Sequence, residues 1–366
     1  MKKKIFLICL LLLFLIRVGA QVTVSSNVDR NLKKFDLETF KNFKSTTTIF
    51  VLSDVYHKDQ YDKILKEYWT VTPYKIVSRY DFKLDDYLEG TYSFALLRAY
   101  CRDVGRVFES FNDITFFFYD YEKNKTKIEK LKIANKPYSD LIYSTRINIG
   151  AIHFFVNTEF IQKINNKFKD GRVEYFYSGI SSNFGSFSTA RRDTLKNSKY
   201  ENDRIKEVFN SRIYKNYTLG YLKNYFQKIN NLISNEEFMG MQEPISTDEL
   251  KNLALQTLFI PEYNKTTYKP VKIEDEQKSE KEISNLFEDY IYKFEFISEK
   301  DLDEKIFSEK NFYYLRYVKI NNQKFFEVVN GKTGEIIYKE HEEGFFTFNI
   351  QGSDFKKLAK KIKSKI

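Results

Sequence analysis

Cysteine, histidine and tryptophan are scarce in this chain, which has two, three and one of them among its 366 residues. Cys9 lies in an apolar run near the start, so Cys101 is the one cysteine in the rest of the chain, and a disulfide within that part is excluded. The widely separated His57, His153 and His341 also argue against a zinc site, which takes four nitrogen, sulfur or oxygen ligands. We therefore expect no metal ion and no cofactor, and a fold held by buried apolar area, much of it from Phe and Tyr.

Long apolar runs are scarce too, and the one that is present opens the chain. Residues 2–4 are lysines, residues 5–16 are apolar and residues 18–20 are Val-Gly-Ala. This order is that of a secretory signal peptide cleaved after Ala20. The run is shorter than the roughly 20 residues that a helix needs to cross a bilayer. A lipid anchor on Cys9 is the alternative, disfavoured because the apolar run continues beyond it. We expect an exported bacterial protein, periplasmic or extracellular, without a transmembrane span after cleavage.

Positive charge is in mild excess. Removal of residues 1–20 takes away Lys2, Lys3, Lys4 and Arg17 and lowers the formal net charge from +10 to +6. Binding to nucleic acid requires a concentrated basic face. We therefore expect no nucleic-acid partner.

After a lead-in at residues 21–47, one pattern of elements occurs twice, in residues 48–134 and in residues 257–342. Each copy begins with a short apolar run typical of a strand buried on both faces. A helix follows, with apolar residues at positions i, i+3, i+4 and i+7. These positions match one for one: Tyr61, Ile64, Leu65 and Tyr68 in the first copy, and Ile283, Leu286, Phe287 and Tyr290 in the second.

Capping residues are repeated along with the apolar positions. Ser279 with Glu282 forms a capping box that marks the start of the helix in the second copy. The third strands begin at the same spacing, at Tyr92 and at Phe312. Before them, each second strand ends in a serine that has an acid three residues later and is expected to open a further short helix: Ser78 with Asp81, and Ser298 with Asp301.

A hairpin is predicted to close each copy. In the first copy Ile114–Tyr121 turns into Thr126–Ile133, and in the second Phe325–Val329 turns through residues 330–334 into Glu335–Tyr338. The Gly-Lys-Thr at residues 331–333 is not a phosphate-binding loop, because Phe326 stands where that motif needs glycine. The sequence therefore predicts an α/β fold (an α+β mixed sheet) built from two β-α-β-α-β-hairpin modules.

The element order of each module resembles that of the CsgG-like and TolB amino-terminal modules of bacterial envelope proteins. Through the stretch Trp69-Thr70-Val71-Thr72-Pro73-Tyr74, more of the chain resembles a family of uncharacterised exported proteins of outer-membrane-bearing bacteria. The second copy has Ile291-Tyr292 in place of the tryptophan loop. This resemblance implies a location in the cell envelope and a fold, and it implies no known activity.

Residues 135–256 predict a mainly helical insert, with apolar stripes over Val156–Phe168 and Leu219–Ile233. Between the stripes, residues 178–189 are rich in serine and glycine and are typical of a long exposed loop, where we would first look for a ligand. The loop begins like a nucleophile elbow but has Asn183 where that motif needs glycine. The candidate ligand residues are Ser181, Ser182, Asn183, Arg191 and Arg192, with Trp69 as a candidate aromatic contact.

Residues 343–366 predict a last strand and an amphipathic helix with Ser353 as its cap. The apolar side of this helix is expected to dock on the second copy, and contact with an anionic membrane surface is the alternative. The helix has six lysines on its other sides. Its apolar side consists of Phe355, Leu358, Ala359, Ile362 and Ile366.

Three functions are compatible with these features, and we predict no catalytic residue. The first is a non-catalytic cell-envelope or secreted protein that acts by binding or scaffolding, with an envelope protein or a glycan as partner. The second is glycan or peptide binding through aromatic residues of the middle segment. The third is a hydrolase with dispersed catalytic residues, since paired carboxylates need not be adjacent in the sequence.

Overall fold

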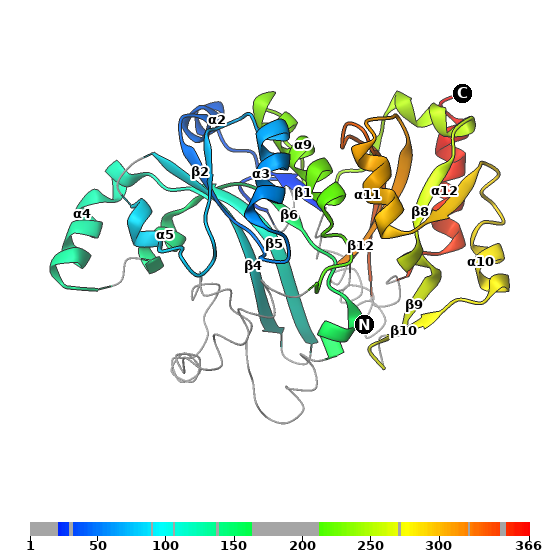
Figure 1. Ribbon diagram of the computed structural model, residues 1–366, viewed down its shortest axis with the longest axis horizontal. Coiled ribbons are helices and arrows are strands. Elements are labelled where there is room, and N and C mark those ends of the chain that lie inside the picture. Colours follow the sequence, from blue (N-terminus) through cyan, green and yellow to red (C-terminus); the bar gives the residue numbers. More distant parts are fainter. Residues whose placement is uncertain are drawn as a thin grey trace, which may run out of the picture.

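The computed structural model describes residues 21–28, 32–88, 91–104, 107–136, 139–162, 212–269, 272–320, 323–344 and 349–366. It has the predicted mixed α/β architecture. Two units lie side by side, and each is built on a six-stranded mixed sheet (Figure 1).

The first sheet has the strand order β1-β6-β5-β4-β2-β3. β2 pairs in parallel with β3 and β4, whereas β4, β5, β6 and β1 pair antiparallel in turn. Its strands are β1 (Val22–Val24), β2 (Thr47–Val51), β3 (Tyr74–Ile76), β4 (Tyr92–Val104), β5 (Val107–Phe118) and β6 (Ile147–His153). Its connections contain α2 (Leu37–Lys44), α3 (Lys58–Tyr68), the 3-10 helix η2 (Leu84–Tyr87), α4 (Tyr121–Ile133) and α5 (Ser139–Thr145).

The second sheet has the strand order β11-β8-β12-β13-β14-β7. Its strands are β7 (Ile245–Ser246), β8 (Leu258–Pro261), β11 (Phe294–Ile297), β12 (Tyr313–Ile320), β13 (Gln323–Asn330) and β14 (Ile336–Glu343). Its helices are η3 (Asp248–Ala254), η4 (Glu262–Lys265), α10 (Glu280–Leu286), α11 (Glu299–Phe307) and α12 (Gly352–Lys363). A separate ladder joins β9 (Thr266–Lys269) to β10 (Glu274–Gln277).

The two sheets have the same topology. Read from the edge, β3-β2-β4-β5-β6-β1 corresponds to β11-β8-β12-β13-β14-β7, with the same parallel and antiparallel pairs. Among the described residues, α9 (Leu219–Ser234) is the first long helix after β6, and α12 follows β14. The shared strand order extends through β6, which lies beyond residue 134.

Each sheet also buries one arginine–carboxylate pair between its first two antiparallel strands. Arg98 on β4 faces Asp113 on β5 and binds it through two hydrogen bonds, Nε to Oδ1 and Nη2 to Oδ2, both 2.9 Å. Arg316 on β12 faces Glu327 on β13, with Nε 2.8 Å from Oε2. All four side chains are buried, so loss of either partner would leave an uncompensated charge in the core.

The hairpin predicted in the first copy is wrong. β5 ends at Phe118, and residues 121–133 form α4 instead of a return strand. Asp120 caps α4 by accepting a hydrogen bond from the Lys123 amide, and the following residues are largely lysine and glutamate, which favour a helix. β5 pairs with β4 and with β6.

The expected helix at Ser78 is also wrong, whereas its counterpart at Ser298 is correct. The Ser298 hydroxyl accepts a hydrogen bond from the Asp301 amide and caps α11. After Ser78 the chain turns, and η2 begins only at Leu84. Phe82 is buried there beside Phe94. Packing of Phe82 in the core therefore takes the place of the expected helix.

α12 docks on the second unit through its apolar stripe. Phe355, Leu358, Ala359 and Ile362 are buried, whereas Ile366 is 77% exposed. The cap is Gln351, one residue before the helix begins, so the prediction of Ser353 as the cap is wrong.

Candidate functional site

α9 joins the two units. It packs against α3 and β1 of the first unit and against α11 of the second, and most of its side chains are buried. In Figure 1 it lies between the two sheets. Because a helix buried on nearly all sides must satisfy its polar side chains with protein partners, the polar residues of α9 define the junction.

The amino end of α9 is held by a carboxylate of the second unit. Asp303, on α11, accepts hydrogen bonds from the Thr218 hydroxyl and, at 3.2 Å, from the Gly220 amide. A side chain on Gly220 would place its Cβ only 2.5 Å from Asp303 Oδ1, so glycine permits this approach. The negative charge also faces the positive end of the helix dipole.

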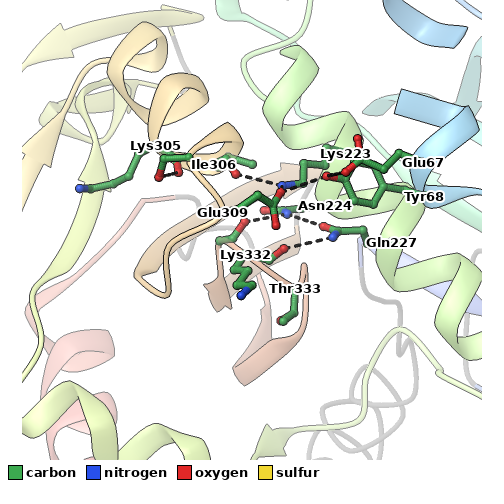
Figure 2. A network of polar contacts seen from close by, with 12 residues as sticks. Glu67, Tyr68, Lys223, Asn224, Gln227, Lys305, Ile306, Glu309, Lys332 and Thr333 are labelled. Atoms are coloured by element: carbon green, nitrogen blue, oxygen red, sulfur yellow. Dashed lines mark hydrogen bonds and ion pairs between the residues drawn. The ribbon is translucent and has the colours of Figure 1, made fainter. Parts of the chain in front are cut away.

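One turn further along, Lys223 joins three elements (Figure 2). Its buried ammonium group donates a 2.9 Å hydrogen bond to the Ile306 carbonyl and pairs with the Glu309 carboxylate after α11. Tyr68, at the end of α3, donates to the same carboxylate at 3.0 Å. Burial acts to raise the pKa of Glu309, but the hydrogen bonds from Lys223 and Tyr68 outweigh it, and the pKa is lowered.

The hairpin turn of the second unit provides a third contact with α9. Asn224 Nδ2 donates to the Gly331 carbonyl at 3.0 Å, and Gln227 Nε2 donates to the Lys332 carbonyl at 3.1 Å (Figure 2). Gly334 has a φ of 73°, and a Cβ there would lie 2.5 Å from the Asn224 carbonyl oxygen. The Gly-Lys-Thr segment is therefore the turn between β13 and β14, as predicted, and it packs on α9.

A groove of about 770 Å³ opens at the amino end of α9. Both units contribute to its walls. Tyr56, Arg212 and Thr218 come from the chain before α9, and Glu299, Lys300, Asp303, Glu304, Phe307 and Ser308 come from α11 and the residue after it.

The groove has charges of both signs and two aromatic rings. Burial raises the pKa of Asp303 to about 6, against the opposing effect of its hydrogen bonds from Thr218 and Gly220. Burial and the nearby charge of Asp303 raise the pKa of Glu299. The guanidinium carbon of Arg212 lies 5.9 Å from the ring centroid of Tyr56. Phe307 is 40% exposed, so the groove offers apolar surface beside its charged groups.

The candidate residues Ser181, Ser182, Asn183, Arg191 and Arg192 lie outside the described residues. The prediction of Trp69 as an aromatic contact is wrong, because this side chain is only 3% exposed. Its ring packs against Phe50 and Phe116, and its Nε1 donates to Thr72 Oγ1 at 2.9 Å. The loop that holds Trp69 therefore contributes this side chain to the core of the first unit.

The three histidines occupy separate places in the fold. His57 precedes α3 as its cap residue, His153 is buried with Nε2 3.0 Å from the Val28 carbonyl oxygen, and His341 stacks on Phe325. Within the part of the chain that the structure describes, no group of three or more His, Cys, Asp or Glu could hold a metal ion. Nor does any helix among those residues combine the length and apolar character needed to cross a membrane.

Searches of protein-family models, of curated proteins and of solved structures find no match to this chain. The resemblance to exported envelope proteins therefore stays a prediction. The groove between the units is the candidate site that the geometry itself defines.

Proposed function

We propose that this is an exported, non-catalytic binding protein that receives its ligand in the groove at the junction of its two units. The observation that carries the proposal is the construction of the groove. Its walls come from both units, and α9 fixes those units to each other through hydrogen bonds and ion pairs. Groups held in place before the ligand arrives lose little conformational entropy on binding.

The state of Asp303 supports binding over catalysis. A carboxyl group with a pKa of about 6 is suited to general acid–base chemistry. Asp303, however, already accepts hydrogen bonds from Thr218, the N-cap residue of α9, and from Gly220, so it serves to hold the amino end of α9. Its raised pKa follows from burial at the junction.

We propose a peptide as the ligand class. Charges of both signs in the groove match the charged side chains and amide groups of a peptide, and Tyr56 and Phe307 offer surface to its apolar side chains. A glycan would rest chiefly on exposed aromatic faces. Trp69 is the one tryptophan, and it is buried, so it cannot stack on a sugar ring.

A hydrolase is the second candidate, because Glu299 and Asp303 both have raised pKa values and lie one helical turn apart on α11. In this case Glu299 would have to act on the substrate together with Asp303. The two candidates differ in whether a bound peptide is cleaved.

Selection from a phage-displayed library of random peptides tests the proposal. Selected peptides should bind at least about ten-fold more weakly to Glu299→Gln and to Phe307→Ser, a loss of about 1.4 kcal/mol. Ile133→Ser is the control, because Ile133 is 87% exposed on α4 of the first unit. The proposal would be contradicted if no peptide is selected. It would also be contradicted if the selected peptides bind both groove variants as tightly as the wild type. Cleavage of the peptides that is lost in Glu299→Gln would favour the hydrolase.

A further inference from the structure

Two of the most exposed large apolar side chains lie at one end of the second unit. Leu255 is 86% exposed and Ile291 is 79% exposed. Each stands three residues before a strand, β8 or β11, and these strands are parallel neighbours. The Leu258 amide donates to the Lys293 carbonyl at 3.0 Å, so the two strands begin side by side. Leu255 and Ile291 therefore share the end of the sheet at which β8 and β11 start.

The carboxyl end of α12 reaches the same region. α12 packs along η3, the helix that leads to Leu255, and Lys365 donates a 2.8 Å hydrogen bond to Asp248 at the start of η3. Figure 1 places the carboxyl terminus beside this part of the second unit. Ile366, 77% exposed, is thus a third apolar side chain at this end.

Lysines lie on the same segments of the chain as these side chains. On the outer face of α12, Lys360, Lys361 and Lys363 are exposed and form no ion pair with any described residue. The same holds for Lys251 on η3 and Lys293 before β11.

Two acidic groups near this end are paired with other lysines, and three are not. Asp248 is paired with Lys365, and Asp289 is paired with Lys356. Glu249 on η3 accepts hydrogen bonds from Tyr313 and Asn330 and has no ion-pair partner among the described residues. Glu288, beside Asp289, and Glu295, the second residue of β11, are exposed and add two further negative charges. We call this surface the apolar-basic end. It consists of Leu255, Ile291, Ile366 and the five unpaired lysines. It has an excess of positive charge.

We infer that the apolar-basic end adsorbs to an anionic lipid bilayer. The lysines face the headgroups, and Leu255, Ile291 and Ile366 enter the boundary between headgroups and acyl chains. A bilayer matches both parts of the surface, whereas a nucleic acid would match the lysines alone. The stripe of α12 that packs on the second sheet stays buried, so the helix binds without leaving its unit. The inference does not rest on the proposed peptide groove.

Co-sedimentation of residues 21–366, which hold all the described strands and helices, with lipid vesicles tests this inference. The chain should bind vesicles of mixed phosphatidylglycerol and phosphatidylcholine, bind phosphatidylcholine alone much more weakly, and lose affinity as salt is raised. The triple variant Lys360→Gln, Lys361→Gln, Lys363→Gln should bind about 100-fold more weakly, because each lysine near an anionic surface contributes about five-fold.

The apolar part has its own test. Leu255→Ser with Ile291→Ser should weaken vesicle binding at least about ten-fold, because both side chains lose their transfer into an apolar environment. All these positions are exposed, so the melting temperature should stay within the error of the wild type.

Two matched controls lie on α4 of the first unit. Ile133→Ser repeats the apolar change at an equally exposed position, and Lys123→Gln, Lys125→Gln, Lys127→Gln repeats the loss of charge. Both control variants should bind like the wild type. The inference is overturned if the wild type ignores anionic vesicles, if the controls lose as much affinity as the test variants, or if a DNA duplex binds as tightly and depends on the same lysines.

Discussion

At the scale of single residues, Gly220 has the clearest structural reason for its identity. It is the second residue of α9, and the atom that a side chain would add falls within 2.5 Å of Asp303 Oδ1. Asp303 is in turn the acceptor that holds the amino end of α9. The space left by one missing methyl group therefore allows the two units to meet.

Gly220→Ala is expected to destabilise the protein by about 1–3 kcal/mol, because displaced Asp303 loses hydrogen bonds while it stays largely buried. Urea unfolding measures the change. In an Asp303→Ala background the same substitution should be neutral or stabilising by up to about 1 kcal/mol, since alanine is the better helix former. Equal destabilisation in both backgrounds would contradict the assigned contact.

Lys319 on β12 gives a prediction about pH. It is 7% exposed, and burial lowers the pKa of its ammonium group to about 7. The unfolded chain, with a pKa near 10.5, binds the proton more tightly than the folded chain does. The contribution of Lys319 to stability therefore rises between about pH 7 and 10.5. Lys319→Met should raise the free energy of unfolding at pH 6 and raise it less at pH 9. A gain that is the same at both pH values would contradict the burial of the charge.

At the scale of elements, α12 has a purely structural apolar stripe. Phe355 is fully buried and packs against Phe287 and Phe326, with ring centroids 4.3 and 5.2 Å away. Phe355→Ala should cost about 3–5 kcal/mol in urea unfolding, from lost apolar burial and the cavity left behind.

Ser353→Ala should change stability by less than about 0.5 kcal/mol, because Gln351 is the cap. A larger loss at Ser353 would show that the helix begins later.

Elements whose signals are local could be predicted from the sequence. Ser279 and Glu282 form the expected capping box, Ser298 caps α11, and the hairpin of β13 and β14 has its expected turn. The predicted return strand is α4 instead, because the Asp120 cap and the lysine-rich composition after it favour a helix. For Ser78, packing of Phe82 in the core outweighed the local capping signal.

The groove could not be predicted because its contacts are distant in sequence. Asp303 and Thr218 are separated by 85 positions, and Lys223 and Glu309 by 86. The sequence does hold a weak signal at Asp303, an acid on the amphipathic helix next to the buried Leu302 and three residues before Ile306. Such a carboxylate at the edge of an apolar stripe indicates a contact, but its partner is known only from the fold.

At the scale of the whole molecule, the two units share a strand order but not their connections. α4 and α5 lie between β5 and β6, whereas a tight turn joins β13 to β14. That turn is the part of the second unit that Asn224 and Gln227 of α9 contact. The short connection thus lets the second hairpin approach α9, and the longer one lies at the far side of the first unit (Figure 1).

The central claim is that α9 makes the two units one cooperative body, which fixes the walls of the groove. Differential scanning calorimetry of residues 21–366 tests it most directly. Chains of this size with two sheets often unfold in steps, so cooperativity is informative. The account predicts a single transition whose calorimetric and van't Hoff enthalpies agree. Two resolved transitions, with one unit melting while the other stays folded, would contradict it.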